Sequence, residues 1–238
     1  MEPRGHISVI RNCCCSVSSS KFKTSTKIIV FIFAAMISVP SIVLLVFWQH
    51  IQPFDTWLLT HINQDWSNPF FDAVLPYLRE TKFWVPLYFF LLLFTTINFK
   101  SKAWWWIGAV VVVAASSDLI SSKLIKPYII RDRPCNDISV MQQIRFFVNY
   151  CPQSSSFTSS HATSHFAQAM FFFLTLRHVI GKWALLFFLW AFAIAYTQVY
   201  VGVHYPFDVF CGGLLGCGIG FAIAKLFHNR VGMLSLDK

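Results

Sequence analysis

Charge is scarce in this chain of 238 residues. Only 12% of the residues are charged, whereas 56% are hydrophobic and the mean hydropathy is +0.57. Soluble domains usually carry about 25% charged residues, so the composition excludes an ordinary soluble domain and indicates an integral membrane protein. Acidic residues are the scarcer charged class, with 10 Asp and Glu against 19 Lys and Arg, which gives a formal net charge of +9.

Several other features are missing. No basic stripe with interleaved aromatic residues is present, so the positive charge does not indicate a nucleic-acid partner. No group of His, Cys, Asp and Glu has the spacing of metal ligands, and there is no internal repeat. A long polar stretch precedes the first apolar run and no small-residue cleavage site follows it, which argues against a secretory signal. We therefore expect one membrane domain that needs neither a metal nor another cofactor.

What the sequence does contain is a series of apolar runs near the length that crosses a bilayer, about 20 residues. We place six of them, at residues 28–48, 83–99, 104–124, 165–180, 183–201 and 207–227. The predicted fold is all-α, an integral membrane bundle of six transmembrane helices. We divide the chain into a polar cytoplasmic leader, 1–27, and a membrane domain, 28–238. Two mixed polar and apolar stretches between the first two runs, 54–59 and 70–75, predict short interfacial helices.

Three short polar patches adjoin these apolar runs. The first contains Lys126, Arg133 and Pro134. Arginine offers a planar fork to phosphate oxygens and lysine a point charge, so the pair suits phosphate binding. Seven residues are two helical turns, but Pro127 and Pro134 make a bent loop an equal alternative. Taken alone, basic residues at a helix end could simply contact lipid headgroups.

The second patch is Thr158, Ser159, Ser160 and His161, immediately before the fourth predicted helix. A helix N-terminus presents free backbone N–H groups and favours an anion. His161 could act as an acid that protonates a leaving oxygen. The structural alternative is that Ser159 or Ser160 is an ordinary N-cap.

The third patch contains His204 and Asp208, with Pro206 suited to the first turn of the sixth helix. A carboxylate four residues away can hold one imidazole nitrogen and expose the other as a nucleophile. The alternative is a helix-start Asp stabilised by the helix dipole, beside an incidental histidine.

The charge bias orients the predicted bundle. One side holds most of the basic residues: Arg4, Arg11, Lys21, Lys23, Lys27, Lys100, Lys102, Arg177, Lys182, Lys225, Arg230 and Lys238. By the positive-inside tendency this side is cytoplasmic. The opposite side carries the other 7 of the 19 basic residues and all three patches. We therefore place the candidate site at the outer face of a bacterial inner membrane, towards the periplasm or exterior.

The three patches together resemble the signature of the type 2 phosphatidic acid phosphatase family, which shares its site with vanadium haloperoxidases. That family reads Lys-x6-Arg-Pro, then Pro-Ser-Gly-His, then Ser-Arg-x5-His-x3-Asp. The first element is present in full. In the second, Thr158 and Ser160 replace the family's Pro and Gly; in the third, Thr197 and Gln198 replace its Ser and Arg.

The resemblance implies a metal-independent lipid phosphatase that works through a phosphohistidine. His204 would be the nucleophile, Asp208 its partner and His161 the general acid. The implied phosphate-binding residues are Lys126, Arg133, Ser159, Ser160 and Gln198. Losing the family's charge at position 198 would cost about 1.5–3 kcal/mol of binding, which Arg131 or a charge on the substrate could offset.

The expected substrate is a lipid phosphate or diphosphate. Undecaprenyl diphosphate or a similar envelope lipid is our preferred prediction, with phosphatidylglycerophosphate, phosphatidic acid and lipid A phosphate as alternatives. Two other classes stay open: a catalytically impaired relative that binds phospholipid, which Gln198 favours, and a transporter in which the intramembrane Asp118 couples transport. The expected partners are membrane lipids, and the sequence does not predict an oligomeric state.

A disulfide between Cys135 and Cys151 is predicted independently of the resemblance. Both fall in the outer loop that holds the first two patches, and the outer side is oxidising. The other five cysteines fall in the leader or in the last apolar run. Closing this loop would contribute about 3 kcal/mol in the chain-entropy model and would limit movement of Arg133 relative to Ser159.

Overall fold

The computed structural model describes residues 47–235, and within them it contains helices and loops but no strand. The all-α prediction is therefore confirmed for this part of the chain. The predicted leader, 1–27, and most of the first predicted span, 28–48, lie outside the described residues. Residues 47–51 are helical. Residues 52–235 belong to a separate compact unit.

The helices follow one another with short connections, apart from one long loop. Residues 52–60 are helical and lead into η1 (His61–Asp65), α2 (Pro69–Leu78), η2 (Thr81–Trp84), α3 (Val85–Phe99), α4 (Ser101–Asp118) and the π-helical η3 (Leu119–Ile125). The long loop contains η4 (Met141–Gln143), and α5 (Ser160–Ile180), η5 (Gly181–Leu185), α6 (Leu186–Tyr200) and α7 (Pro206–Val231) follow. Both stretches predicted as short helices in the first outer loop are helical.

Four stretches of the described chain are long and apolar enough to cross a membrane: 81–99, 101–125, 160–200 and 206–231. The third has 41 residues, about twice the length that a crossing needs. It contains α5 and α6, which fold back on each other, as the ring contacts of Phe172 with Phe187 and of Phe173 with Phe188 show. The protein is thus an integral membrane protein, and the total of six spans stays a prediction.

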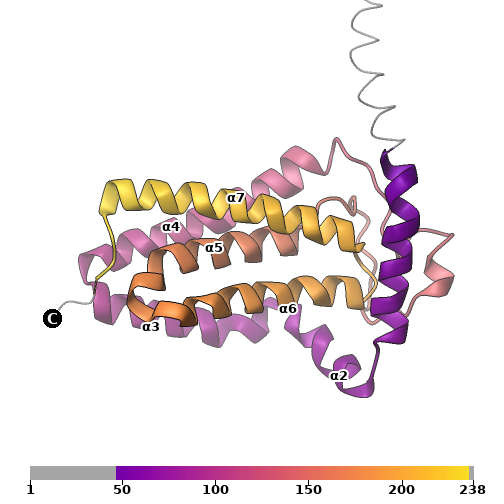
Figure 1. Cartoon of the computed structure of the whole chain (residues 1–238), viewed down its shortest axis with the longest axis horizontal. Coiled ribbons are helices and arrows are strands. Elements are labelled where there is room, and N and C mark those ends of the chain that lie inside the picture. The colour runs from indigo at the N-terminus through magenta and orange to yellow at the C-terminus, as the bar shows by residue number, and fades with distance from the viewer. Residues whose placement is uncertain (1–46, 236–238) are drawn as a thin grey trace, which may run out of the picture. The chain divides into compact units, whose positions relative to one another are not determined.

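α5 is the central helix, packed by α4, α6 and α7. Its aromatic residues Phe171 and Phe172 are fully buried, and the indole N–H of Trp106 in α4 donates to the hydroxyl of Thr175 at 2.9 Å. Figure 1 shows α5, α6 and α7 running alongside one another, with the start of α5, the end of α6 and the start of α7 at the same end. This arrangement brings residues from all three helices to one end of the bundle.

Close backbone contact joins α5 to α7. A Cβ on Gly216 would lie 2.2 Å from the carbonyl oxygen of Thr163, and one on Gly220 would lie 2.2 Å from that of Ala167. These distances leave no room for any side chain, so glycine is required at both positions. Small residues of this kind let membrane helices approach closely, whereas Gly218 has no neighbour within 4 Å of such an atom.

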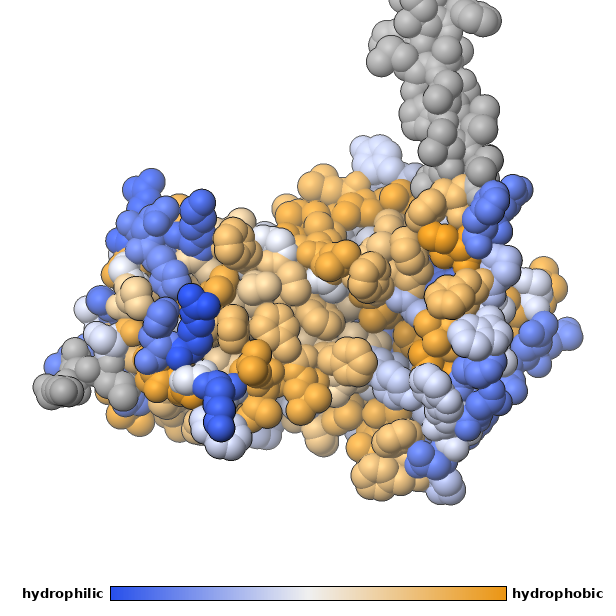
Figure 2. Space-filling model, viewed as in Figure 1, coloured by the Kyte–Doolittle hydropathy of each residue, from blue (hydrophilic) through white to orange (hydrophobic). Residues whose placement is uncertain are grey.

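The polarity of the surface changes along the length of the bundle. Figure 2 shows hydrophobic side chains over the middle of the helices and hydrophilic ones gathered near the end of α7. At that end the ammonium of Lys102 donates to the carbonyl of Met233 at 3.0 Å, which joins the start of α4 to the end of α7. Large hydrophobic residues such as Phe90 and Leu189 are about 60% exposed, which suits contact with lipid tails. The motif residues lie at the opposite end.

The long loop is cross-linked as predicted, by a disulfide between Cys135 and Cys151. Two hydrogen bonds lie beside it: the Ser156 amide donates to the Arg131 carbonyl at 2.8 Å, and Arg133 Nε donates to the Ser154 carbonyl at 2.9 Å. The two sides of the loop are therefore held together on either side of the candidate phosphate ligand Arg133.

Candidate active site

The turn between α6 and α7 places His204. Gly202 has φ +79°, and a Cβ there would lie 3.1 Å from the Arg145 carbonyl oxygen, so this position needs glycine. The amides of Val203 and His204 both donate to the carbonyl of Gln198 at 3.2 Å, which closes the end of α6. Pro206 is the first residue of α7, as predicted.

Asp208 lies in the first turn of α7 and faces the imidazole of His204. Their Oδ2 and Nδ1 atoms are 3.8 Å apart, which is longer than a hydrogen bond. The hydroxyl of Ser156 lies between them, at 2.5 Å from Asp208 Oδ2 and 3.4 Å from His204 Nδ1. The predicted pairing is therefore partly mediated by a serine that the sequence analysis missed.

The other imidazole nitrogen faces Arg133. Nη1 of Arg133 lies 3.0 Å from His204 Nε2, and a guanidinium can only donate. Nε2 therefore carries the lone pair and Nδ1 the proton, directed at Ser156 and Asp208. Burial lowers the pKa of His204 to about 4, and the charges of Arg133 and Lys126 act in the same direction while Asp208 opposes them. His204 is thus neutral at pH 7, with an available nitrogen lone pair.

Lys126 follows the π-helical turn η3, at the point where the chain leaves the helix. The segment from Lys126 to Arg133 is therefore a helix end followed by a loop, not two turns of one helix. Burial lowers the pKa of Lys126 to about 8, with a further contribution from the charge of Arg133. Arg133 itself is 4% exposed, and burial lowers its pKa to about 10. Two cations close enough for the charge of Arg133 to lower the pKa of Lys126 suit the binding of a doubly charged anion.

The N-terminus of α5 starts earlier than expected, at Ser160 rather than near residue 165. Ser159 is its N-cap, and its hydroxyl accepts from the Ala162 amide at 3.4 Å. The Ser160 hydroxyl contacts those of Ser121 and Ser122 at 3.0 and 3.1 Å. Both side chains therefore have structural partners. The backbone N–H groups of the first helical turn have no partner within the helix and can bind an anion.

The sequence predicted that His161 precedes the helix. The structure places it in the first turn of α5. Its imidazole is half-buried and stacks on His165 at a centroid distance of 6.3 Å. The charges of Arg79, His204 and Lys126 all act on it. His161 is therefore within electrostatic range of His204 and Lys126, and Arg133 contacts His204 directly.

Gln198 lies in the last turn of α6 and is fully buried. Its amide nitrogen and amide oxygen both lack a hydrogen-bond partner among the described residues. A buried amide without partners costs free energy, so a group that pairs with it in the substrate complex would recover that cost. Its backbone carbonyl, in contrast, anchors the His204 turn.

Arg131 does not replace the missing cation at position 198. Its guanidinium donates to Asp208 Oδ1 at 2.5 Å and to Asp55 Oδ2 at 2.6 Å, and all three side chains are buried. It also lies 4.0 Å from the ring centroid of Tyr205. Asp55 in turn accepts from the Phe207 amide at 2.8 Å, at the start of α7. Asp55 could not be identified from the sequence, since nothing in its amphipathic segment signals this distant contact.

Arg79, the residue that follows α2, is another cation near the cluster that the motifs did not indicate. Its charge acts on both Arg133 and His161, and burial lowers its own pKa. Asp118, by contrast, is exposed and accepts from the Ser122 hydroxyl at 2.8 Å. No ion pair between Asp118 and Lys123 is found in the described part of the chain.

The family model of the PAP2 superfamily matches residues 103–231. The chain belongs to the PAP2 superfamily. This match contains all three motif patches and the helices that carry them. In view of this membership and the relatives below, the protein is a membrane lipid phosphatase.

Two curated relatives are lipid A 4'-phosphatases. That of Bacteroides thetaiotaomicron is 29% identical over 192 residues, which cover 79% of this chain and 84% of the relative. That of Porphyromonas gingivalis is 26% identical over 112 residues, 46% of each chain.

Two solved structures have a similar fold. A transmembrane PAP2-type phosphatidylglycerolphosphate phosphatase of Bacillus subtilis superposes with a TM-score of 0.60 at 19% identity, covering 76% of this chain and 88% of that one. LpxE of Aquifex aeolicus superposes with a TM-score of 0.50 at 27% identity, covering 71% of this chain and 93% of that one. The first of these likenesses concerns the fold alone.

Proposed function

We propose that this PAP2 phosphatase removes a phosphate group from lipid A or a closely related glycolipid through a phosphohistidine intermediate. The observation that carries the mechanism is the contact between Arg133 Nη1 and His204 Nε2. It supports an imidazole whose lone pair faces the phosphate-binding cations, which is the state that a nucleophile needs. The substrate class is supported by the two lipid A 4'-phosphatase relatives; nothing in the comparisons specifically favours undecaprenyl diphosphate.

The proposed reaction has two steps. His204 Nε2 attacks phosphorus, the N–P bond forms and the bond from phosphorus to the lipid oxygen breaks, while His161 donates a proton to that oxygen. Water then attacks the phosphohistidine, His161 accepts a proton from it, and inorganic phosphate leaves. Lys126, Arg133 and the first-turn amides of α5 stabilise the charge that develops on the phosphate oxygens. Asp208 holds the Nδ1 proton of His204 and stabilises the positive charge that forms on the ring.

We also propose that the site faces the periplasm from the inner membrane. The disulfide between Cys135 and Cys151 supports this orientation, because it lies beside the site and disulfides persist in oxidising compartments. The basic end of the bundle, near the end of α7, is the opposite end and suits the cytoplasm.

The test is phosphate release by the purified protein in detergent. The panel contains lipid A phosphate, undecaprenyl diphosphate, phosphatidylglycerophosphate and phosphatidic acid, each with and without EDTA. We expect the highest kcat/KM with lipid A phosphate, no effect of EDTA, and loss of release in His204→Gln. A phosphoenzyme that is labile to acid and stable to base should form with the wild type but not with this variant.

The possible outcomes separate the parts of the proposal. Fastest release from undecaprenyl diphosphate would overturn the substrate assignment and leave the mechanism standing. Activity that EDTA abolishes and a divalent ion restores would overturn the mechanism. Binding of phospholipid without release from any lipid of the panel would favour the catalytically impaired relative, which the buried Gln198 also suggests.

A further inference from the structure

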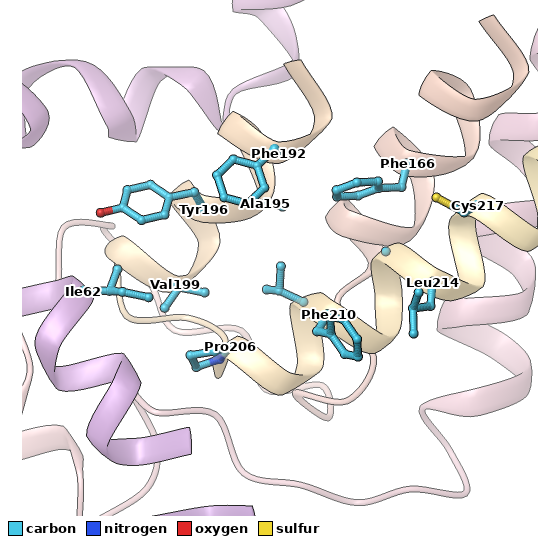
Figure 3. Close-up of a pocket in the computed structure, with 12 residues that line it drawn as sticks. Ile62, Phe166, Phe192, Ala195, Tyr196, Val199, Pro206, Phe210, Leu214 and Cys217 are labelled. Carbon is cyan, nitrogen blue, oxygen red and sulfur yellow. The ribbon is translucent and has the colours of Figure 1, made fainter. Parts of the chain in front are cut away.

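An apolar groove lies between α5, α6 and α7, close to the turn that carries His204. It encloses about 320 Å³. Figure 3 shows Phe166 of α5, Phe192 of α6, and Phe210 and Leu214 of α7, all of which line the groove. The mechanism proposed above makes no use of this groove.

The groove exists because α6 and α7 both pack on α5 and leave a gap between them, which Phe166 underlies. Gly213 allows the Phe166 ring to lie there, since a Cβ on Gly213 would be 3.3 Å from the ring. The rim is open to the bilayer, because Phe192, Phe210 and Leu214 are each 60% exposed. A lipid chain can therefore enter sideways from the membrane.

The length of the groove matches one leaflet. Along α7 it extends from Pro206, the first helical residue, to Cys217. Eleven residues of α-helix rise about 16 Å at about 1.5 Å each. Half of the hydrocarbon core is about 15 Å thick. The groove therefore runs from the membrane interface to about the middle of the bilayer, which is the span of one acyl chain.

The upper end of the groove and the phosphate site share the same backbone segments. Val199 follows Gln198 in α6, and Pro206 and Val209 flank Asp208 in α7. A chain that lies in the groove therefore has its headgroup at the level of His204. This continuity favours the substrate's own chain over an unrelated bilayer lipid.

We propose that the groove binds one acyl chain of the lipid whose phosphate is hydrolysed, and so selects substrates with long chains. The proposal rests on the proposed phosphatase function. We expect the groove to favour chains long enough to reach Cys217, the lining residue of α7 furthest along the sequence from His204. The contacts are apolar, so they contribute binding through buried hydrocarbon rather than through recognition of the headgroup.

The first test fills the lower end of the groove with Cys217→Trp. KM should rise about tenfold for a full-length lipid A phosphate, since several methylene groups lose their burial. KM should stay unchanged for a short-chain analogue and for p-nitrophenyl phosphate, which do not reach Cys217. The matched control is Val111→Trp, at a lipid-exposed position of α4 away from the groove, and it should leave all three values unchanged.

The outcomes keep this proposal separate from the proposed function. If Cys217→Trp hydrolyses the long and short lipids with wild-type constants, the groove is not the chain site, although the phosphatase stands. If the wild type hydrolyses no phosphate ester, the proposed function fails first. A loss of p-nitrophenyl phosphatase activity in Cys217→Trp would show a damaged fold, and the second test then decides.

The second test uses wild-type protein and a lipid A phosphate with a photoreactive group at its chain end. Labelling should fall on α7 near Cys217 and on Phe166, and unlabelled lipid A phosphate should compete. The same glycolipid without phosphate should compete at least tenfold less well, since it lacks the group that Arg133 and Lys126 bind. Equal competition by both would mean that the groove takes any bilayer lipid, and labelling elsewhere would also overturn the proposal.

Discussion

The guanidinium of Arg131 lies 2.5 Å from the carboxylate of Asp208, and both groups are buried. Arg131 thereby fixes the carboxylate that faces the Nδ1 side of His204, while Asp55 holds Arg131 from the other side at 2.6 Å. We therefore assign Arg131 a positioning role at a distance from the phosphate.

Arg131→Gln should lower kcat on the order of 100-fold, the cost of a small displacement in an active site, with a smaller change in KM. Removing its positive charge should also raise the pKa of His204 above about 4, so the acid limb of the kcat/KM profile should move to higher pH. Arg145→Gln is the control, because Arg145 pairs with Asp72 outside the site. An unchanged acid limb would show that Arg131 has only a structural role.

The pH range of activity should reflect His204, Lys126 and the proposed general acid His161, which must carry a proton to act. Below about pH 4 His204 takes up a proton and loses its lone pair; above about pH 8 Lys126 loses its charge. The pH profile of kcat/KM should therefore fall on both sides of this window. Lys126→Arg should keep the acid limb and move the alkaline limb to higher pH, because arginine stays charged. An alkaline limb that does not move would show that another group controls it.

Gln198→Arg should keep or raise the affinity for phosphate, measured as competitive inhibition by inorganic phosphate. A charge-assisted hydrogen bond of about 1.5–3 kcal/mol corresponds to about 10–100-fold. Gln198→Met is the matched control, since it removes the unpartnered amide at similar volume. If the amide binds phosphate, the Met variant should bind phosphate less well; if it does not, the Met variant should only be more stable. A weaker affinity in a folded Arg variant would contradict the proposal.

Gly216→Ala should destabilise the protein by about 1–3 kcal/mol or more, the usual cost of overpacking, because the added Cβ would lie 2.2 Å from the Thr163 carbonyl oxygen. Gly218→Ala, two residues away in the same helix, has no atom within 4 Å of the added Cβ. It should be neutral or stabilise by up to about 1 kcal/mol. Thermal unfolding in detergent compares the two. Equal midpoints would contradict the close contact between α5 and α7.

The helices and the short polar patches could be predicted because they depend on local patterns. Apolar runs predicted α3 to α7, and the fixed spacings within each patch predicted Lys126, Arg133, His161, His204 and Asp208. Helix ends were less accurate: α5 starts at Ser160 because Ser159 caps it, and the polar residues of its first turn hid that start from a hydropathy pattern.

The contacts between distant segments could not be predicted. Asp55 reaches Arg131 across 76 residues, and Ser156 reaches Asp208 across 52. Only the folded loop brings them together, and no local spacing encodes that. For the same reason, the prediction that Arg131 could offset the missing charge at position 198 is wrong. Its sequence neighbours suggest phosphate binding, but two buried carboxylates already hold it.

The glycine contacts between α5 and α7 have a mechanical consequence for turnover. His161 is in the first turn of α5 and Asp208 in the first turn of α7, and the Ser159 amide donates to the Asp208 carbonyl at 3.1 Å. With their backbones in contact, the two helices can neither slide nor separate without breaking that contact, so the proposed acid and the partner of the nucleophile move as one body. Motion that releases phosphate is therefore not expected to change the separation of these two groups.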